Sequence, residues 1–390
     1  MTAVEGSKPR SGSELFLEQF LPGISPAVVK LRELIDRLNS QRNLGFVRQV
    51  LIVGPSGAGK NHLAQVLAGH RRFLELYNTG DDPGIDAGLT AYTDRFEEVH
   101  LPAVPDNLVE SELFGYKKGA FTGAEHDTPG YLGGPGAKKG TEKTDILLDE
   151  IGDASTVMQA KILRLIDKGE FRPVGGAKDD DVYHTSARLL MATNKPLQQL
   201  VQSNQFREDL YWRALQLVID VPALSQQREN IEPTAKAIER EIKREMGVEE
   251  DLTIVGHRNW DMAWATNGYE WPGNVRELEQ AVRRWFFEEG RLSVQEVVRQ
   301  AHADISRIGR PLAVARPAAT AVKERLRAAA RRGASLGVLN DVLREVADEA
   351  RSGICEWYDE EHPTEDMLRA LFPGARPDSV RNKISEWRNR

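Results

Sequence analysis

A glycine-rich run that ends in lysine contains the residues best suited to chemistry in this sequence. The run comprises Gly54, Pro55, Ser56, Gly57, Ala58, Gly59 and Lys60, and Asn61 follows it. Its glycines allow backbone N–H groups to converge on phosphate oxygens, and a helix that follows would point its positive dipole end at them. Lys60 would add a full charge near the β and γ phosphates. A structural turn is the alternative, but the position of the run between an apolar strand and a helix favours nucleotide binding.

Two adjacent carboxylates, Asp149 and Glu150, follow a second apolar run in which Asp145 is the only charge. Asp149 is placed to orient Mg²⁺ through its water shell, and Glu150, beside the same metal, to polarise the water that attacks the γ-phosphate. The pair could instead cap the next helix, but the glycine-rich run upstream favours catalysis. Most such loops carry Ser or Thr after the lysine to hold magnesium. Because this chain has Asn61 there, Mg²⁺ binding is expected to depend on acidic residues downstream.

The segments around these residues indicate an α/β fold. Strands are predicted over residues 48–53, 144–150 and 188–194, and helices over 26–38, 61–69, 154–169 and 233–245. Ser25 is placed to cap the first of these helices, with Pro26 at its first position. Residues 70–95 resemble a loop-rich insertion, because glycine, proline and aspartate gather there.

Composition and charge restrict the class of protein. The chain has 390 residues, of which 40% are hydrophobic and 28% charged, as in an ordinary protein of two or three domains. Its net charge of −7 means that nucleic-acid binding would need a local basic patch. The single cysteine, Cys355, excludes an internal disulfide and fits a reducing cytoplasm. The sequence shows neither a signal peptide nor a membrane span, so a cytoplasmic protein without a membrane partner is expected.

The C-terminal region differs in composition and ends in a basic helical pattern. Residues 376–390 contain five basic residues against two acidic ones, and apolar residues form a stripe along the predicted last helix. This pattern resembles the end of a helix-turn-helix or winged-helix module, with Arg381, Lys383 and Arg388 as candidate DNA contacts. A solvated basic helix that packs on its neighbour is the alternative.

One segment resembles a known family. Gly119, Ala120, Phe121, Thr122, Gly123 and Ala124 follow the string Glu-Ser-Glu-Leu-Phe-Gly-Tyr-Lys-Lys at 110–118. Together they resemble the sigma-54-contacting loop of bacterial enhancer-binding proteins, which are ring-forming AAA+ ATPases. The glycines loosen the backbone around Phe121, and an exposed aromatic residue is a common anchor for a partner surface. The motif-based resemblance covers about residues 20–300.

The resemblance implies an AAA+ P-loop fold with a parallel sheet, a helical lid and a small C-terminal helical domain. Residues 1–13 are expected to be disordered, 14–224 to form the α/β subdomain, 225–302 the lid, 303–318 a linker, and 319–390 the C-terminal helical domain, a candidate for DNA binding. It also implies a hexamer, with ATP and Mg²⁺ at each subunit interface. No segment before the ATPase core is long enough for a sensing domain, so regulation is expected to be absent, to reside in another protein or to reside in residues 319–360.

The resemblance further implies roles for polar residues outside the glycine-rich run. Asn194, in an Ala-Thr-Asn string, would position the attacking water. Arg207 and Arg213, in the string Phe-Arg-Glu-Asp-Leu-Tyr-Trp-Arg, would be arginine fingers that reach the neighbouring subunit's γ-phosphate, with surface ion pairing as the alternative. Arg276, in Trp-Pro-Gly-Asn-Val-Arg-Glu-Leu, would reach the nucleotide from the lid of its own subunit.

His100 stands where the family usually has an asparagine that bonds the Walker B acid and couples the nucleotide to the loop. A histidine can donate one such hydrogen bond and could make the coupling sensitive to pH. The alternative is a polar residue that merely ends a strand.

The function implied is ATP-driven remodelling of the closed complex of sigma-54 RNA polymerase holoenzyme, which activates transcription from promoter DNA. Two other functions stay open at this point. Asn61 and His100 would also suit an AAA+ scaffold that is gated by nucleotide and hydrolyses little ATP. The insertion at 70–95 and the unusual C-terminus would also suit a remodeller of a different partner.

Overall fold

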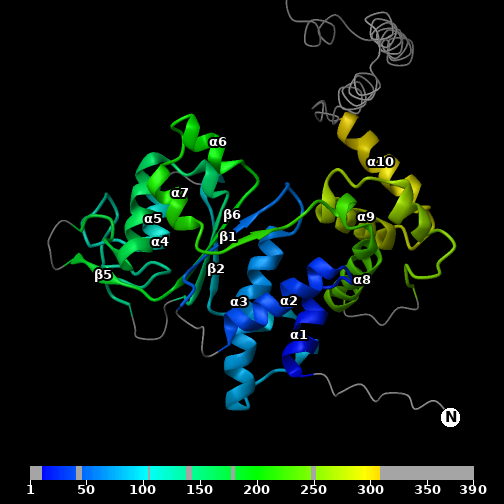
Figure 1. Ribbon diagram of the computed structural model, residues 1–390, viewed down its shortest axis with the longest axis horizontal. Helices are drawn as coiled ribbons and strands as arrows, with labels where there is room; N and C mark the ends of the chain where they lie inside the picture. Colours follow the sequence, from blue (N-terminus) through cyan, green and yellow to red (C-terminus); the bar gives the residue numbers. More distant parts are fainter. Residues whose placement is uncertain are drawn as a thin grey trace, which may run out of the picture. The chain divides into compact units, whose positions relative to one another are not determined.

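The computed structural model describes residues 11–40, 46–103, 106–137, 143–176, 181–246 and 252–307 (Figure 1). The candidate DNA contacts Arg381, Lys383 and Arg388, the C-terminal helical domain and most of the predicted linker lie outside these residues. So do residues 1–10 of the segment expected to be disordered.

A five-stranded parallel sheet lies at the centre of the α/β subdomain. Its strands are β1 (Gln49–Val53), β2 (Phe96–His100), β3 (Asp145–Asp149), β6 (Arg188–Thr193) and β7 (Val218–Asp220). Their order in the sheet is β2-β3-β6-β1-β7, and every pair is parallel. The carboxyl ends of parallel strands meet at one edge, so the residues after β1, β3 and β6 are brought together there. The predicted parallel α/β core is confirmed.

Helices cover both faces of the sheet (Figure 1). On one face lie α1 (Gly12–Phe20), α2 (Pro26–Asn39) and α3 (Lys60–Thr79). On the other lie α4 (Asp106–Phe114), α5 (Thr156–Lys168), α6 (Leu197–Gln202) and α7 (Glu208–Ala214). A short antiparallel pair, β4 (Glu170–Phe171) and β5 (Tyr183–His184), stands apart from the main sheet.

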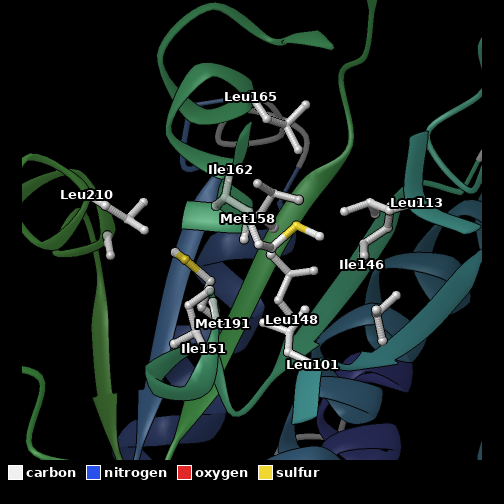
Figure 2. Packing of buried hydrophobic residues seen from close by; sticks show 14 of the residues in the cluster. Leu101, Leu113, Ile146, Leu148, Ile151, Met158, Ile162, Leu165, Met191 and Leu210 are labelled. Carbon is white, nitrogen blue, oxygen red and sulfur yellow. The ribbon is translucent and has the colours of Figure 1, made fainter. Parts of the chain in front are cut away.

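Each buried strand divides its side chains between two hydrophobic cores. In β3, Ile146 and Leu148 pack beneath α4 and α5, whereas Leu147 packs on the other face with α1 to α3. Figure 2 shows Ile146 and Leu148 converging with Met158 and Ile162 of α5. Successive residues of a strand point to opposite faces, so a strand covered on both faces is apolar at nearly every position. This explains why the sequence pattern of these strands is continuous rather than alternating.

The lid forms a third core of its own. Its helices are α8 (Ile231–Met246), α9 (Asn274–Phe287) and α10 (Val294–Arg307), with a π-helical turn at Trp264–Gly268. The core is built around the fully buried rings of Trp271 and Trp285. Because α10 extends to Arg307, the first residues of the segment expected to be a linker are helical instead.

Several predicted element ends are confirmed, and others differ. Ser25 caps α2 by accepting a hydrogen bond from the Val28 N–H, with Pro26 at the first helical position. At the start of the chain, α1 begins at Gly12, inside the segment expected to be disordered, because Ser11 and Glu14 form a capping box.

The insertion expected at residues 70–95 is largely helical, and the prediction of a loop over its first ten residues is wrong. Helix α3 continues through Gly69 to Thr79, and Gly80 ends it in the left-handed conformation. A Cβ atom at Gly69 would lie 2.8 Å from the Leu89 side chain, so the glycine permits a close approach rather than ending the helix. Short 3₁₀ turns at Ile85–Ala87 and Leu89–Tyr92 lie within the remainder.

Asp145, the charge within the apolar run, is paired inside the core. Its Oδ1 accepts a hydrogen bond from Arg188 Nε at 2.5 Å, and Arg71 Nη1 lies 3.3 Å from its Oδ2. Arg188 also donates to Asn39 Oδ1 at 2.8 Å. A buried carboxylate is tolerated when a matching donor saturates it, and loss of either partner would leave an uncompensated charge.

This polar network continues to His70, a fully buried histidine on α3. Asn39 Nδ2 lies 3.2 Å from its Nδ1, and Ser13 Oγ lies 2.8 Å from its Nε2. Burial lowers the pKa of His70 to about 4, against the attraction of Asp36 and with some help from Arg188. The folded protein therefore holds His70 neutral at a pH where an unfolded chain would protonate it.

We expect this histidine to make stability depend on pH. As pH falls from about 6.5 to about 4, the unfolded state binds a proton that the native state excludes. The free energy of unfolding therefore falls by roughly 3 kcal/mol over this range, and His70 causes no further loss below it. Urea denaturation of wild type and His70→Gln between pH 7.5 and pH 4.5 measures the effect. The variant should lose this part of the pH dependence, whereas His126→Gln, at an exposed histidine, should keep it. Equal pH dependence in wild type and His70→Gln would contradict the assignment.

No helix within the described ranges is both long and apolar enough to span a bilayer.

Candidate functional site

The glycine-rich run forms a loop between β1 and α3, as predicted. Gly57 and Gly59 both have positive φ angles, +73° and +98°, which favour glycine. A Cβ atom at Gly57 would lie 2.3 Å from the carbonyl oxygen of Gly273 in the lid, so no other residue fits there. Helix α3 begins at Lys60, which places its N-terminal N–H groups at the loop. The backbone therefore has the form that binds phosphate.

Lys60 lies nearly buried inside this loop. Its Nζ donates hydrogen bonds to the carbonyl oxygens of Gly54 at 3.2 Å and Pro55 at 3.1 Å. Burial lowers the pKa of the Lys60 ammonium, while the nearby carboxylates of Glu150 and Asp149 raise it. The lysine is thus positioned between the loop and the acidic pair, where a phosphate chain would run.

The acidic pair lies at the end of β3, where the sheet order brings it beside the loop. Glu150 adopts a left-handed backbone conformation with φ of 55°, which turns the chain sharply after Asp149. Glu150 Oε2 accepts a hydrogen bond from the backbone N–H of Asn194 at 3.1 Å. Asn194, after the end of β6, is therefore adjacent to Glu150, and its side chain is exposed. The structure brings these three predicted residues together.

His100 contacts the acidic pair directly. Strand β2 pairs with β3 in a register that sets His100 opposite Asp149, and the His100 Nδ1 lies 2.9 Å from Asp149 Oδ2. The expectation that His100 bonds a Walker B acid is borne out by this contact, and the acid is Asp149 rather than Glu150. Asn61 Nδ2 donates to the same Asp149 oxygen at 3.2 Å and to Glu98 Oε1 at 2.5 Å.

Glu98 is a member of this cluster that sequence reasoning missed. It lies on β2 two residues before His100, on the same side of the strand. Burial raises the pKa of its carboxyl, and the neighbouring Asp149 adds to the rise, although the hydrogen bond from Asn61 opposes it. Nothing in the local sequence distinguishes Glu98 from Glu97, because the contact with Asn61 depends on the pairing of distant segments.

The lid closes over the loop at two places. The Arg276 N–H donates to the Gly57 carbonyl at 3.2 Å, and Arg276 Nη1 lies 3.4 Å from Ser56 Oγ. Asn274 Nδ2 donates to the Ser56 carbonyl at 2.9 Å. Arg276 therefore contacts the phosphate loop, and its reach to the nucleotide stays a prediction. Asn274 was missed, although it lies inside the motif that pointed to Arg276.

A cavity of about 1080 Å³ joins these features. Its polar end is lined by the phosphate loop and the acidic pair, and its apolar end by Leu21, Pro22, Ile219, Val221 and Leu224. Asn230, also missed by sequence reasoning, ties this apolar end to the lid. Its Oδ1 accepts from the Ile24 and Ser25 N–H groups at 2.9 and 3.0 Å. The cavity has the size of a small-molecule site and combines polar and apolar lining residues.

The two candidate arginine fingers do not line this cavity. Arg207, before the first residue of α7, forms a two-bond ion pair with Asp209 at 2.7 and 3.0 Å, and Arg213 pairs with Asp167 at 2.9 Å. Their side chains are 45% and 62% exposed. Within one chain they are surface ion pairs, so any contact with a nucleotide must come from a neighbouring copy.

The 119–124 segment forms an exposed tip on a hydrogen-bonded base. The Gly119 N–H donates to the Ala124 carbonyl at 2.8 Å, and the Phe121 side chain is 48% exposed beside the ring of Tyr116. The base is held by Tyr116, whose backbone pairs with Thr128 and forms a bridge with Val174. Loop and base therefore present one aromatic side chain to solvent.

The sigma-54 interaction domain model matches residues 21–220, which is just over half of the sequence. The chain belongs to this family. Its members include the Nif-specific regulatory protein of Klebsiella oxytoca, which is 34% identical over 281 residues, covering 72% of this chain and 46% of the relative. The nitric oxide reductase regulator NorR of Aeromonas salmonicida is 35% identical over 268 residues, covering 67% of this chain and 44% of the relative. The chain thus spans less than half the length of these two relatives of the sigma-54 interaction domain family.

Solved structures agree on the fold of this family. NtrX from Brucella abortus, in a crystal structure with ATP, matches with a TM-score of 0.52 and 23% sequence identity, covering 84% of this chain and 69% of NtrX. At this identity the likeness shows the fold alone. Together with the family match, it confirms the AAA+ core that the motifs predicted.

Proposed function

We propose that this chain hydrolyses ATP and uses the movement of the 119–124 tip to remodel the closed complex of sigma-54 RNA polymerase, thereby activating transcription. The observation that carries the proposal is the short path between site and tip. His100 contacts Asp149 inside the cavity, and the chain continues from it through α4 to the tip. A change at the acidic pair can therefore reach Phe121 through a single helix. The named relatives, which are transcription regulators, support the same role.

The polar end of the cavity fits a magnesium-bound nucleotide. Carboxylate oxygens are suitable Mg²⁺ ligands, and such sites are completed by phosphate oxygens rather than by a cage of protein side chains. When bound, Mg²⁺ would supply positive charge that neutralises the charge developing on the phosphate oxygens. Asp149 and Asn61 are the residues that would lie nearest to it.

The chain's own residues supply the remaining steps. The phosphate loop and Lys60 bind and orient the phosphate chain, and Arg276 holds the lid against it. The Glu150 carboxylate, fixed by the Asn194 N–H, polarises the attacking water and accepts its proton. Arg207 and Arg213 of a neighbouring copy stabilise the charge on the transferred phosphoryl group. Such head-to-tail contacts between identical chains can close into a ring, and we propose a ring of six copies. We further propose that the ring acts in the cytoplasm and binds DNA through residues 319–390.

The tip is tested by separating ATP hydrolysis from transcription. Phe121→Ala should leave ATP hydrolysis within about twofold of wild type, because Phe121 does not line the cavity, and should lower open-complex formation at least about tenfold, because an exposed aromatic anchor is lost. The measurements are ATP turnover and open-complex formation with purified sigma-54 holoenzyme on a promoter that requires it.

Phe287→Ala is the matched control, since Phe287 is an exposed phenylalanine of the lid. It should leave both activities unchanged. If Phe121→Ala activated transcription as well as wild type, the proposed role of the tip would be wrong, and a different partner would become the better explanation.

A further inference from the structure

Asn61 occupies the position where a phosphate loop usually carries a hydroxyl group for magnesium. Its side chain lies between two carboxylates, with Nδ2 at 2.5 Å from Glu98 Oε1 and at 3.2 Å from Asp149 Oδ2. The three residues come from the start of α3 and from strands β2 and β3. These two contacts give the Asn61 side chain a defined orientation.

The chemistry of the amide fixes which atom remains for a ligand. A side-chain amide has two N–H donors on nitrogen and one acceptor oxygen. Both donors of Asn61 face carboxylate oxygens, which can only accept. The opposite orientation would set the amide oxygen against two carboxylates and is excluded by repulsion. Oδ1 is therefore the atom of Asn61 that is left to bind a cation, and an amide oxygen is a suitable Mg²⁺ ligand.

Glu98 is the residue that makes this orientation exclusive. Asp149 also receives a hydrogen bond from His100 and is a candidate metal neighbour itself, so its hold on Asn61 is shared. Glu98 forms no second side-chain hydrogen bond with a residue that the structure describes, and its contact with Asn61 is the shorter of the two. It acts on the metal only through the amide.

We propose that Asn61 supplies its amide oxygen to the Mg²⁺ of the bound nucleotide, and that Glu98 is a positioning residue that keeps this oxygen turned towards the metal. The proposal rests on the nucleotide binding proposed above. It replaces the expectation that magnesium binding depends on the acidic residues alone, and it gives β2 an indirect connection to the metal, from Glu98 through the amide of Asn61.

The test measures how strongly Mg²⁺ improves nucleotide binding. A fluorescent ADP derivative is titrated with the full chain, once in excess EDTA and once in excess Mg²⁺. The ratio of the two Kd values is the magnesium effect. Asn61→Leu should reduce this ratio about tenfold, as expected for loss of a metal contact, with the Kd in EDTA unchanged. Asn61→Ser, which restores a hydroxyl oxygen, should keep the ratio within about threefold of wild type.

Glu98→Gln tests the positioning role through a double-mutant cycle. In the wild-type background it should lower the magnesium effect about threefold to tenfold, because a glutamine can offer either a donor or an acceptor to Asn61. In the Asn61→Ser background it should have no effect, since there is no amide to orient. Glu97→Gln, at the neighbouring carboxylate of β2, is the matched control.

The outcomes separate this inference from the proposed function. Equal effects of Glu98→Gln in both backgrounds would overturn the positioning role, and an unchanged magnesium effect in Asn61→Leu would overturn the metal contact. In both cases wild type would still bind nucleotide, so the proposed function would stand. If wild type bound no ADP in either condition, the proposed function would fail, and this inference with it.

Discussion

Replacing Arg207 with alanine is expected to lower the rate of ATP hydrolysis about a thousandfold while leaving ATP binding nearly unchanged, as for other arginines that act on a phosphate from a neighbouring subunit. Arg207 is nearly half exposed, does not line the cavity and is held in a planar ion pair with Asp209. That ion pair raises the pKa of Arg207 and pre-orients its guanidinium at the surface. Such a residue can contribute to catalysis only when a second copy brings a nucleotide to it.

The decisive measurement mixes two inactive variants. Glu150→Gln subunits keep the finger but lose the catalytic carboxylate, and Arg207→Ala subunits keep the carboxylate but lose the finger. A site regains both groups where an Arg207→Ala subunit supplies the carboxylate and a neighbouring Glu150→Gln subunit supplies the finger. If subunits assemble at random in head-to-tail order, about a quarter of the sites have this arrangement, so an equal mixture should recover up to about a quarter of wild-type activity. If Arg207 acted on the nucleotide of its own chain, the mixture would stay inactive.

Arg164→Ala supplies the control for a general surface effect. Arg164 is also a half-exposed arginine in an ion pair, with Glu170 at 3.1 Å, but it lies on α5. Exposed ion pairs of this kind contribute little to stability, so this variant should hydrolyse ATP like wild type.

Wild-type activity per subunit should rise steeply with protein concentration, because each site needs a neighbour.

The parts of the site that were predictable from sequence are those in which neighbouring residues do the chemistry. The phosphate loop, the acidic pair after β3 and the asparagine after β6 each lie in a short run whose flanking pattern also predicts a strand. Once the strands are parallel, their carboxyl ends must meet. The convergence of Lys60, Glu150 and Asn194 followed from that geometry.

The parts that were not predictable depend on contacts between distant segments. Gly69 does not end α3 but leaves the space that the Leu89 side chain occupies, and Leu89 lies 20 positions further along the chain. Likewise, Asp145 was recognised as a charge in an apolar run, but its partner Arg188 could be identified only from the register of β3 and β6. Glu98 belongs to the same class, since only the alignment of β2 beside α3 sets it against Asn61. Local patterns carry no information on such pairs.

The catalytic carboxylate allows a second test with a large effect. Glu150→Gln should lower ATP hydrolysis by about a hundred to ten thousandfold, the usual range for loss of a general base. The glutamine keeps an oxygen that can accept the Asn194 N–H, so the turn after Asp149 and the affinity for ATP should be preserved. Turnover and equilibrium binding of ATP, measured on the same preparation, distinguish this result from unfolding. Glu125→Gln, at an exposed carboxylate outside the cavity, should match wild type in both.

The same variant also tests whether hydrolysis drives the tip. If ATP binding raises the 119–124 segment and hydrolysis withdraws it, Glu150→Gln should accumulate in the raised state and hold sigma-54 holoenzyme longer than wild type in the presence of ATP, because the step that ends the state has been removed. Dissociation rates from immobilised holoenzyme would measure this directly. If Glu150→Gln held the holoenzyme no longer than wild type while hydrolysis was lost, the tip would not be coupled to the nucleotide. The contact between His100 and Asp149 would then be structural and would carry no signal from the site to the tip.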